Sequence, residues 1–256
     1  MVGAWQAYKE EETIRTTRSL ETTGDQMRVE QPAGTRKSLK WIQRAINERW
    51  SSLEAPLLAR LPAGTDLQWL SPLAADAFAE YRDAAFVSRI GHPELESQLR
   101  EFWPSRGPQW DALARGSLGD VLLVEAKAHI AEMCSPGTAA GAASAERIRS
   151  ALEAVAAQIG ARADRADWTR HFYQLANRLA HLDFLRRNGI PAWLVLVGFT
   201  NDADVGGPST SEAWDAAYEV AFHVMGIPRR NSLSSWIIHV TPSVIEARGG
   251  SSLSGP

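Results

Sequence analysis

WDALARGSLGDVLLVEAK, residues 110–127, is the stretch that decides the fold of this chain. Two apolar segments flank Gly116–Asp120, a run of residues that favour turns. Apolar segments joined by a short glycine-containing loop are typical of two antiparallel strands. The stretch therefore predicts a β-hairpin with strands over 109–115 and 121–129.

The loop also predicts how the two strands pair. If Gly116–Asp120 forms the turn, Arg115 lies opposite Val121, and stepping outward brings Asp111 opposite Glu125. Side chains alternate between the faces of a strand, and directly opposed residues share a face with Cβ atoms about 5 Å apart. We therefore expect the side chains of Asp111, Glu125 and Lys127 to converge.

Two carboxylates at this distance in a largely apolar hairpin repel one another. The repulsion is removed by a shared proton, a cation or hydrogen-bond donors. Mg²⁺ prefers carboxylate and carbonyl oxygens, so Asp111, Glu125 and the Ala126 carbonyl are candidate ligands, with Lys127 as a cation that stabilises or deprotonates an attacking water. The alternative is an ordinary hairpin in which Lys127 forms a salt bridge with Asp111 or Glu125.

The rest of the chain predicts helices and further strands around the hairpin. Apolar spacing predicts helices over 38–50, 74–90, 94–103, 145–159, 167–188 and 209–225, and strands over 66–70, 192–200 and 235–241. This order predicts an α/β fold with a mixed central β-sheet flanked by helices.

The same patterns divide the chain into four parts. We expect a flexible or weakly ordered N-terminal arm over 1–35, an N-terminal helical extension over 36–73, an α/β core over 74–245 and a C-terminal tail over 246–256.

Composition restricts the class of protein. The 256 residues are 45% hydrophobic and 22% charged, which is ordinary for a folded domain, and the formal net charge of −3 gives no general attraction to nucleic acid. The single cysteine excludes an internal disulfide and suits a reducing compartment. The longest apolar run, 192–199, is too short to span a bilayer. We expect a cytoplasmic protein that does not act at a membrane.

The motif resembles that of a known superfamily. Trp110-Asp111, thirteen intervening residues and then Glu125-Ala126-Lys127 resemble the PD-(D/E)XK nucleases, which have the restriction-endonuclease-like fold. That core runs helix, three strands, helix, strand, and the resemblance in element order spans about 74–241. The specific part is the hairpin alone, and Trp110 stands where the family often has proline. The resemblance implies hydrolysis of nucleic acid, with DNA favoured, dependent on Mg²⁺ or Mn²⁺.

The resemblance also implies roles for particular residues. It makes Asp111 and Glu125 the metal ligands and Lys127 the catalytic cation. The family often adds a glutamate from its first core helix, for which we choose Glu80 on the expected helix 74–90, with Glu94 and Glu96 as rivals. Many relatives use a glutamine after the motif, here Gln174.

Two further polar groups are open to either a functional or a structural interpretation. Gln174 and Arg178 lie four residues apart on one helical face, where they either hold a phosphate or the attacking water, or are ordinary surface groups. His129 either lines the edge of the cleft or is a strand-end histidine bonded to a loop.

Two other functions remain open on sequence alone. One is a non-catalytic nucleic-acid-binding or defence-associated domain that retains the nuclease fold, and the other is a hydrolase or ligand-binding module unrelated to nucleic acid. The oligomeric state is also open, a homodimer included. If Asp111, Glu125 and Lys127 form a catalytic cluster, we expect that removing any of the three abolishes cleavage and leaves the fold as stable or more stable.

Overall fold

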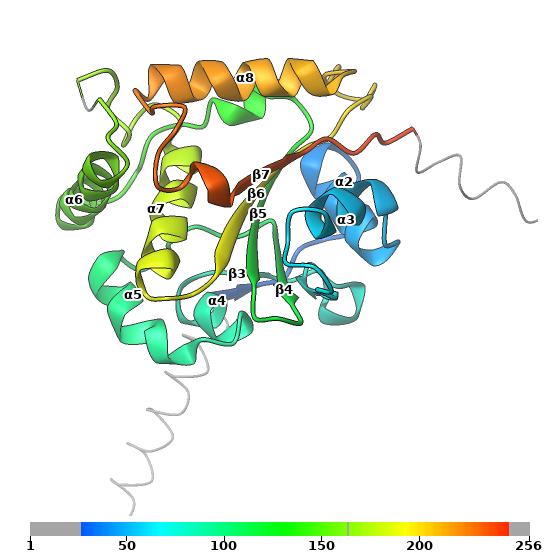
Figure 1. The fold of residues 1–256 in the computed structure, drawn as a ribbon, viewed down its shortest axis with the longest axis horizontal. Coiled ribbons are helices and arrows are strands. Elements are labelled where there is room, and N and C mark those ends of the chain that lie inside the picture. Colours follow the sequence, from blue (N-terminus) through cyan, green and yellow to red (C-terminus); the bar gives the residue numbers. More distant parts are fainter. Residues whose placement is uncertain (1–26, 163, 246–256) are drawn as a thin grey trace, which may run out of the picture.

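A five-stranded mixed sheet forms the centre of the computed structural model, which describes residues 27–162 and 164–245 (Figure 1). The strands lie in the order β2 (Leu67–Ser71), β4 (Ala112–Gly116), β5 (Val121–Lys127), β6 (Ala192–Gly198) and β7 (Ile237–Val240). Neighbours from β2 to β5 are antiparallel, whereas β6 and β7 continue the sheet parallel to β5. The expected α/β class with a mixed central sheet is therefore confirmed.

The hairpin has the predicted register. Arg115 pairs with Val121, and the ladder continues to Ala112 opposite Val124. Gly119, at φ 98°, supplies the left-handed residue that the turn needs. Every residue of β5 is buried, because the strand has neighbours on both edges and helices on both faces.

Helices cover both faces of the sheet (Figure 1). One face packs against α2 (Lys37–Asn47) and α3 (Ser51–Leu58), and the other against α6 (Ala142–Gln158), α7 (Tyr173–Arg187) and α8 (Ser211–Val224). Alternate residues of β5 enter the two cores: Leu122, Val124 and Ala126 face α2, whereas Val121 and Leu123 face α7. Glu125 and Lys127 continue the α7 side by the same alternation.

The N-terminal helices are a layer of this domain and not an extension of it. Trp41, Ile42 and Leu53 pack with residues of the central strands in one core cluster. The expected boundary at residue 73 is also wrong, because β2 is part of the main sheet.

The expected helix over 74–90 is replaced by shorter elements, namely η1 (Ala74–Asp76), β3 (Glu80–Tyr81) and α4 (Asp83–Arg89), followed by η2 (Pro93–Leu95) and α5 (Glu96–Phe102). Ala77 and Phe78 adopt left-handed φ angles of 49° and 50°, which interrupt a right-handed helix. The Asp76 carboxylate fixes this turn by accepting hydrogen bonds from Arg28 and Tyr81.

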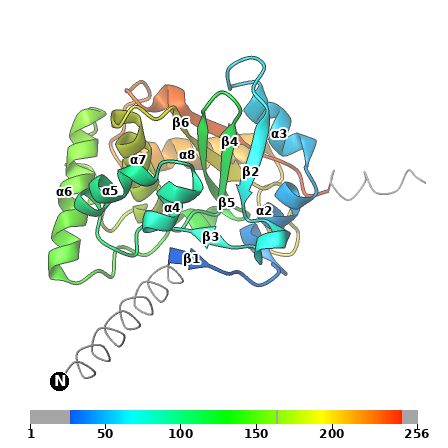
Figure 2. The ribbon, with the colours of Figure 1, turned by 90° about the horizontal axis from the view of Figure 1, so that it is seen from below.

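The short strand β1 (Arg28–Val29) pairs with β3 beside the main sheet (Figure 2). The described part of the expected arm, from Met27 to Thr35, is therefore attached to the domain, which corrects its boundary at residue 35. Residues 1–26 of the expected arm and the whole expected tail, 246–256, lie outside the described residues.

The helix expected over 167–188 begins later than predicted. Asp167 accepts hydrogen bonds from the backbone and hydroxyl of Thr169 in a turn, and α7 starts only at Tyr173, after the left-handed Phe172. The remaining short helices are η3 (Ile130–Met133) and η4 (Ser234–Trp236). Within the described ranges, no helix combines the length and apolar character needed to cross a membrane.

Candidate functional site

Polar side chains from β5 and α7 meet in the core between the two elements. The Glu125 carboxylate binds Lys127 Nζ through Oε1, and its Oε2 accepts a hydrogen bond from Arg178 Nε at 2.6 Å. Lys127 Nζ also donates to Gln174 Oε1 at 3.2 Å. The structure therefore brings together three of the predicted site residues, Glu125, Lys127 and Gln174, and adds Arg178.

Asp111 joins this group from the residue before β4. The ladder ends at Ala112, so Asp111 does not pair with Glu125 as a strand residue. Its Oδ2 instead accepts a hydrogen bond from the Ala126 N–H at 2.7 Å. The N–H and C=O of one strand residue point to the same side, so the Ala126 carbonyl faces the Asp111 edge as well.

Glu80 reaches the site from β3 and not from a helix. It is 5% exposed, and its Oε2 accepts hydrogen bonds from Gln109 and, at 3.2 Å, from Gln31. Burial and the charge of Asp111 raise the pKa of Glu80 to about 8. The rivals lie at the surface: Glu94 is exposed and binds His92, and Glu96 is partly exposed and binds Arg100.

The two motif carboxylates differ in their electrostatics. Burial and the charge of Glu125 raise the pKa of Asp111 to about 6. Burial alone would raise the pKa of Glu125, but the charges of Arg178 and Lys127 outweigh it and hold that pKa below its usual value. Glu125 therefore stays ionised at neutral pH, whereas Asp111 gains or loses its proton near pH 6.

Lys127 is held in its charged form. Burial lowers its pKa, but the charges of Glu125 and Asp111 outweigh this effect and leave the pKa raised. An ammonium group that keeps its proton stabilises negative charge and does not accept a proton from water. Of the two roles considered for Lys127 from the sequence, the geometry supports charge stabilisation.

The donor chemistry of this cluster suits a hard divalent cation in part. Asp111 and Glu125 with the Ala126 carbonyl are oxygen donors, and Mg²⁺ is often bound through one or two carboxylates with waters completing its shell. Both Glu125 oxygens, however, already contact cations. Over residues 27–162 and 164–245, no group of three or more His, Cys, Asp or Glu side chains is arranged to hold a metal. A two-carboxylate site fits these residues, whereas a three-carboxylate cage does not.

No sequence pattern predicted the contacts of Arg178 or placed Trp110 and Tyr218 at the site. Arg178 donates to the Gln109 carbonyl at 2.7 Å, and its guanidinium lies 4.6 Å from the centre of the Trp110 ring. Trp110, which the alternation would place on the opposite face, therefore packs on the α7 side. Tyr218 of α8 is buried near the cluster, where burial and the charges of Glu125 and Asp111 raise its pKa. Only tertiary packing brings residues so distant in sequence together.

His129 lies outside the cluster. Strand β5 ends at Lys127, and His129 precedes η3, where its Nδ1 accepts the N–H of Ala131 at 3.0 Å. Of the two interpretations of His129, the structure therefore supports the strand-end histidine bonded to a loop.

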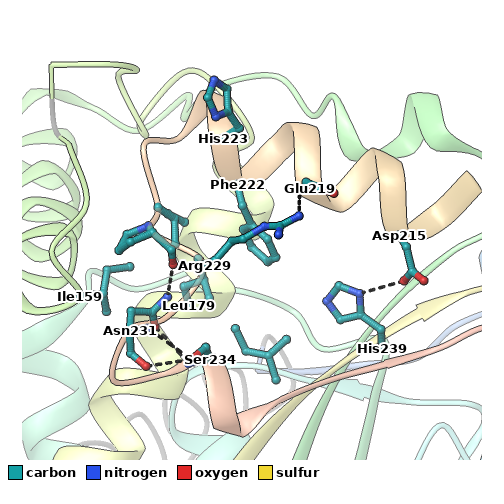
Figure 3. A pocket seen from close by; sticks show the side chains of 13 residues that line it. Ile159, Leu179, Asp215, Glu219, Phe222, His223, Arg229, Asn231, Ser234 and His239 are labelled. Carbon is teal, nitrogen blue, oxygen red and sulfur yellow. Dashed lines mark hydrogen bonds and ion pairs between the residues drawn. The ribbon is translucent and has the colours of Figure 1, made fainter. Parts of the chain in front are cut away.

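A separate cavity of about 580 Å³ lies between α8 and β7 (Figure 3). His239 lines it, with Nδ1 3.7 Å from Asp215 Oδ1, beside the ring of Phe222. The nearby Asn231 and Ser234 side chains bond to their own loop. This cavity is not lined by any residue of the Glu125 cluster.

No protein-family model, curated protein or solved structure matches this chain. The functional conclusion therefore rests on the geometry of the residues described above.

Proposed function

We propose that this protein is a metal-dependent nuclease with a restriction-endonuclease-like core, which hydrolyses phosphodiester bonds in nucleic acid, with DNA favoured, and uses Mg²⁺ or Mn²⁺. The observation that carries the proposal is the convergence of Asp111, Glu125 and Lys127 at the end of the β4–β5 hairpin. A buried glutamate and a partly exposed aspartate beside a charged lysine are costly for a hairpin that has only a structural role.

Each residue of the proposed site has a separate role in catalysis. Asp111, Glu125 and the Ala126 carbonyl would hold the metal ion, which when bound polarises the phosphate and lowers the pKa of a water. Lys127, fixed between Glu125 and Gln174, places a positive charge beside the same edge and stabilises the charge that develops on the phosphate. Gln174 orients Lys127 and does not itself need to touch the phosphate.

Arg178 and Glu80 act on the carboxylates. Arg178 fixes the rotamer of Glu125 and ties it to the Gln109 carbonyl, two residues before Asp111. Glu80, with a pKa of about 8, is mostly protonated at neutral pH. The protonated form limits the negative charge that accumulates beside Asp111.

The direct test is incubation with plasmid, linear and single-stranded DNA and with RNA, in Mg²⁺, Mn²⁺ or EDTA. We expect cleavage in either metal and none in EDTA, and we expect Asp111→Asn and Lys127→Met to lose at least a hundredfold in rate. Arg60→Ala is the control, because Arg60 is an exposed cation at the end of α3 on the other face of the sheet. Cleavage that persists in EDTA, or in both site variants, contradicts the proposal.

One observation favours a second candidate, a non-catalytic nucleic-acid-binding domain of the same fold. Arg178 and Lys127 already saturate both oxygens of Glu125. Such a domain would bind DNA or RNA equally well with and without metal, and Asp111→Asn would leave its affinity unchanged. Metal-dependent cleavage that Asp111→Asn abolishes would exclude it.

A further inference from the structure

A polar cavity of about 670 Å³ is lined by residues that are close in sequence to those of the proposed active site. It lies between the β3–α4 junction, the loop after α5 and the first residues of α6 and α7, and it is lined by Arg82, Asp83, Ser105, Arg106, Thr138 and Tyr173. These are the same segments that deliver the site residues. Arg82 follows Glu80 by two positions, Arg106 precedes Gln109 by three, and Tyr173 is adjacent to Gln174.

The Arg106 guanidinium contributes a positive charge to the cavity. Asp83 also lines it, but its two carboxylate oxygens accept the backbone N–H groups of Arg106 and Gly107, each at 2.9 Å. This clamp holds Arg106 at φ 65°, a left-handed conformation that is unfavourable for a non-glycine residue. The Arg106 side chain remains exposed. The loop therefore presents a cation to the cavity from a fixed backbone.

The other residues that line the cavity suit a phosphate group and an aromatic ring attached to it. The 17-residue helix α6 begins at the cavity after Gly141, without a side-chain cap and without an acidic residue in its first turn, so its dipole adds to the positive potential of Arg106. Thr138 and Ser105 add hydroxyl groups, and the partly exposed ring of Tyr173 offers an aromatic surface.

We propose that this cavity binds one unpaired nucleotide of the nucleic-acid strand, with its phosphate at Arg106 and its base stacked on Tyr173. The inference rests on the proposed function for the place of the scissile phosphate, at Asp111. A base paired within a duplex is stacked between its neighbours and cannot lie on the Tyr173 ring. The cavity therefore selects single strands, frayed ends or flipped nucleotides over intact duplex.

The test measures binding by fluorescence anisotropy in EDTA, so that no strand is cut. The probes are a labelled 12-nucleotide oligothymidylate, a blunt 12-base-pair duplex, free thymidine monophosphate and inorganic phosphate, the last two as competitors. We expect wild type to bind the single strand at least fivefold more tightly than the duplex. Thymidine monophosphate should compete better than phosphate, because only the nucleotide contacts both Arg106 and Tyr173.

Matched variants assign the affinity to this cavity. Arg106→Ala should weaken single-strand binding at least fivefold and reduce the slope of log K against log[salt] by about 0.7, the value for one phosphate contact on a single strand. Arg106→Lys should retain the slope. Tyr173→Leu should weaken binding fivefold or more, whereas Tyr173→Phe keeps the ring and the affinity. Arg60→Ala removes the same charge elsewhere and should change neither quantity.

The outcomes separate this inference from the proposed function. If Arg106→Ala and Tyr173→Leu bind the single strand as Arg60→Ala does, or if wild type prefers duplex, the cavity is not a nucleotide site, whatever the cleavage assay shows. If the variants weaken binding as expected while wild type cleaves nothing in Mg²⁺ or Mn²⁺, the cavity inference holds and the nuclease proposal fails.

Discussion

Arg178 and Glu125 form a buried ion pair, with Nε and Oε2 2.6 Å apart and both side chains 4% exposed. The pair joins α7 to β5, and the same guanidinium reaches the loop that carries Asp111. Isolated charges at this depth are very costly, so each partner depends on the other. The pair is therefore part of the fold as well as of the proposed site.

Arg178→Met should destabilise the protein strongly. The change leaves Glu125 with Lys127 as its only remaining contacting cation among the described residues, and it removes the stacking on Trp110. We expect a loss of about 3 kcal/mol in the free energy of unfolding, measured by urea denaturation. Arg149→Met removes an exposed pair with Glu146 and should cost less than about 1 kcal/mol. Equal effects of the two changes would contradict the structure.

Glu125→Gln should also destabilise the fold, because it leaves Arg178 and Lys127 buried without their anion. This reverses the expectation, drawn from two facing acids alone, that removing a motif residue preserves or increases stability. The double variant Arg178→Met, Glu125→Gln should lose less free energy of unfolding than the two single variants lose in sum, by at least about 1 kcal/mol. Additive losses in this double-mutant cycle would show that the two side chains do not interact.

Glu80→Gln should change how stability depends on pH. The pKa of Glu80 is raised to about 8 in the folded protein, above its unfolded value near 4.5. Between pH 4.5 and 8, the folded protein therefore keeps a proton on Glu80 that the unfolded protein has released. The contribution of Glu80 to the free energy of unfolding is fully present below about pH 4.5 and is lost as the pH rises towards 8.

Denaturation of wild type and Glu80→Gln at pH 5.5, 7 and 8.5 checks this expectation. As the pH rises from about 4.5 to 8, the free energy of unfolding of Glu80→Gln should increase relative to that of wild type by up to about 1.4 kcal/mol for each pH unit. Glu146→Gln, on the exposed surface of α6, is the control. A constant difference for Glu80→Gln would mean that Glu80 is ionised throughout.

The hairpin was predictable because its information is local. The turn residues fix the register, and the register with two-residue alternation fixes the face of Glu125 and Lys127. Gln174 was chosen through the resemblance, and the structure places it beside Lys127, although the helix that carries it begins six residues later than the periodic segment indicated. These inferences need no knowledge of distant contacts.

The path of Glu80 was not predictable, because the contacts that interrupt the expected helix are distant ones. Residues 74–90 have helical spacing, but Asp76 is bound by Arg28, which lies 48 positions earlier, and β3 pairs with β1. These tertiary contacts outweigh a weak local preference. For Arg178 the sequence left open a group that holds a phosphate or the attacking water and an ordinary surface group, and only the packing of α7 on β5 shows that it binds Glu125.

His181→Phe should make the protein less sensitive to acid. His181 is 2% exposed, its Nδ1 donates to the Asn177 carbonyl at 2.8 Å, and its ring packs 4.9 Å from that of Trp103. Burial lowers its pKa to about 3. The neutral ring therefore stabilises the fold fully above the unfolded pKa of about 6.5, and this contribution is lost as the pH falls towards 3.

The variant cannot take up this proton, so its stability relative to wild type should rise by up to about 1.4 kcal/mol for each pH unit below 6. Denaturation at pH 7, 5.5 and 4.5 measures the difference. His223→Phe, on an exposed position of α8, serves as the control. Parallel pH profiles for wild type and His181→Phe would show that His181 is protonated in the folded protein.

Asp111→Asn should abolish stabilisation by Mg²⁺ and leave the fold intact. Asp111 is partly exposed and accepts one backbone hydrogen bond, which the asparagine carbonyl oxygen can also accept. A ligand present at ten times its Kd stabilises the folded state by about 1.4 kcal/mol. Wild type should therefore melt a few degrees higher in Mg²⁺ than in EDTA, as should Glu146→Gln, whereas Asp111→Asn should melt at the same temperature in both. Calorimetric titration with Mn²⁺ gives an independent reading. An equal rise in melting temperature for Asp111→Asn would place the ion elsewhere on the protein, and the proposed role of the hairpin would then fail even if nucleic acid were cleaved.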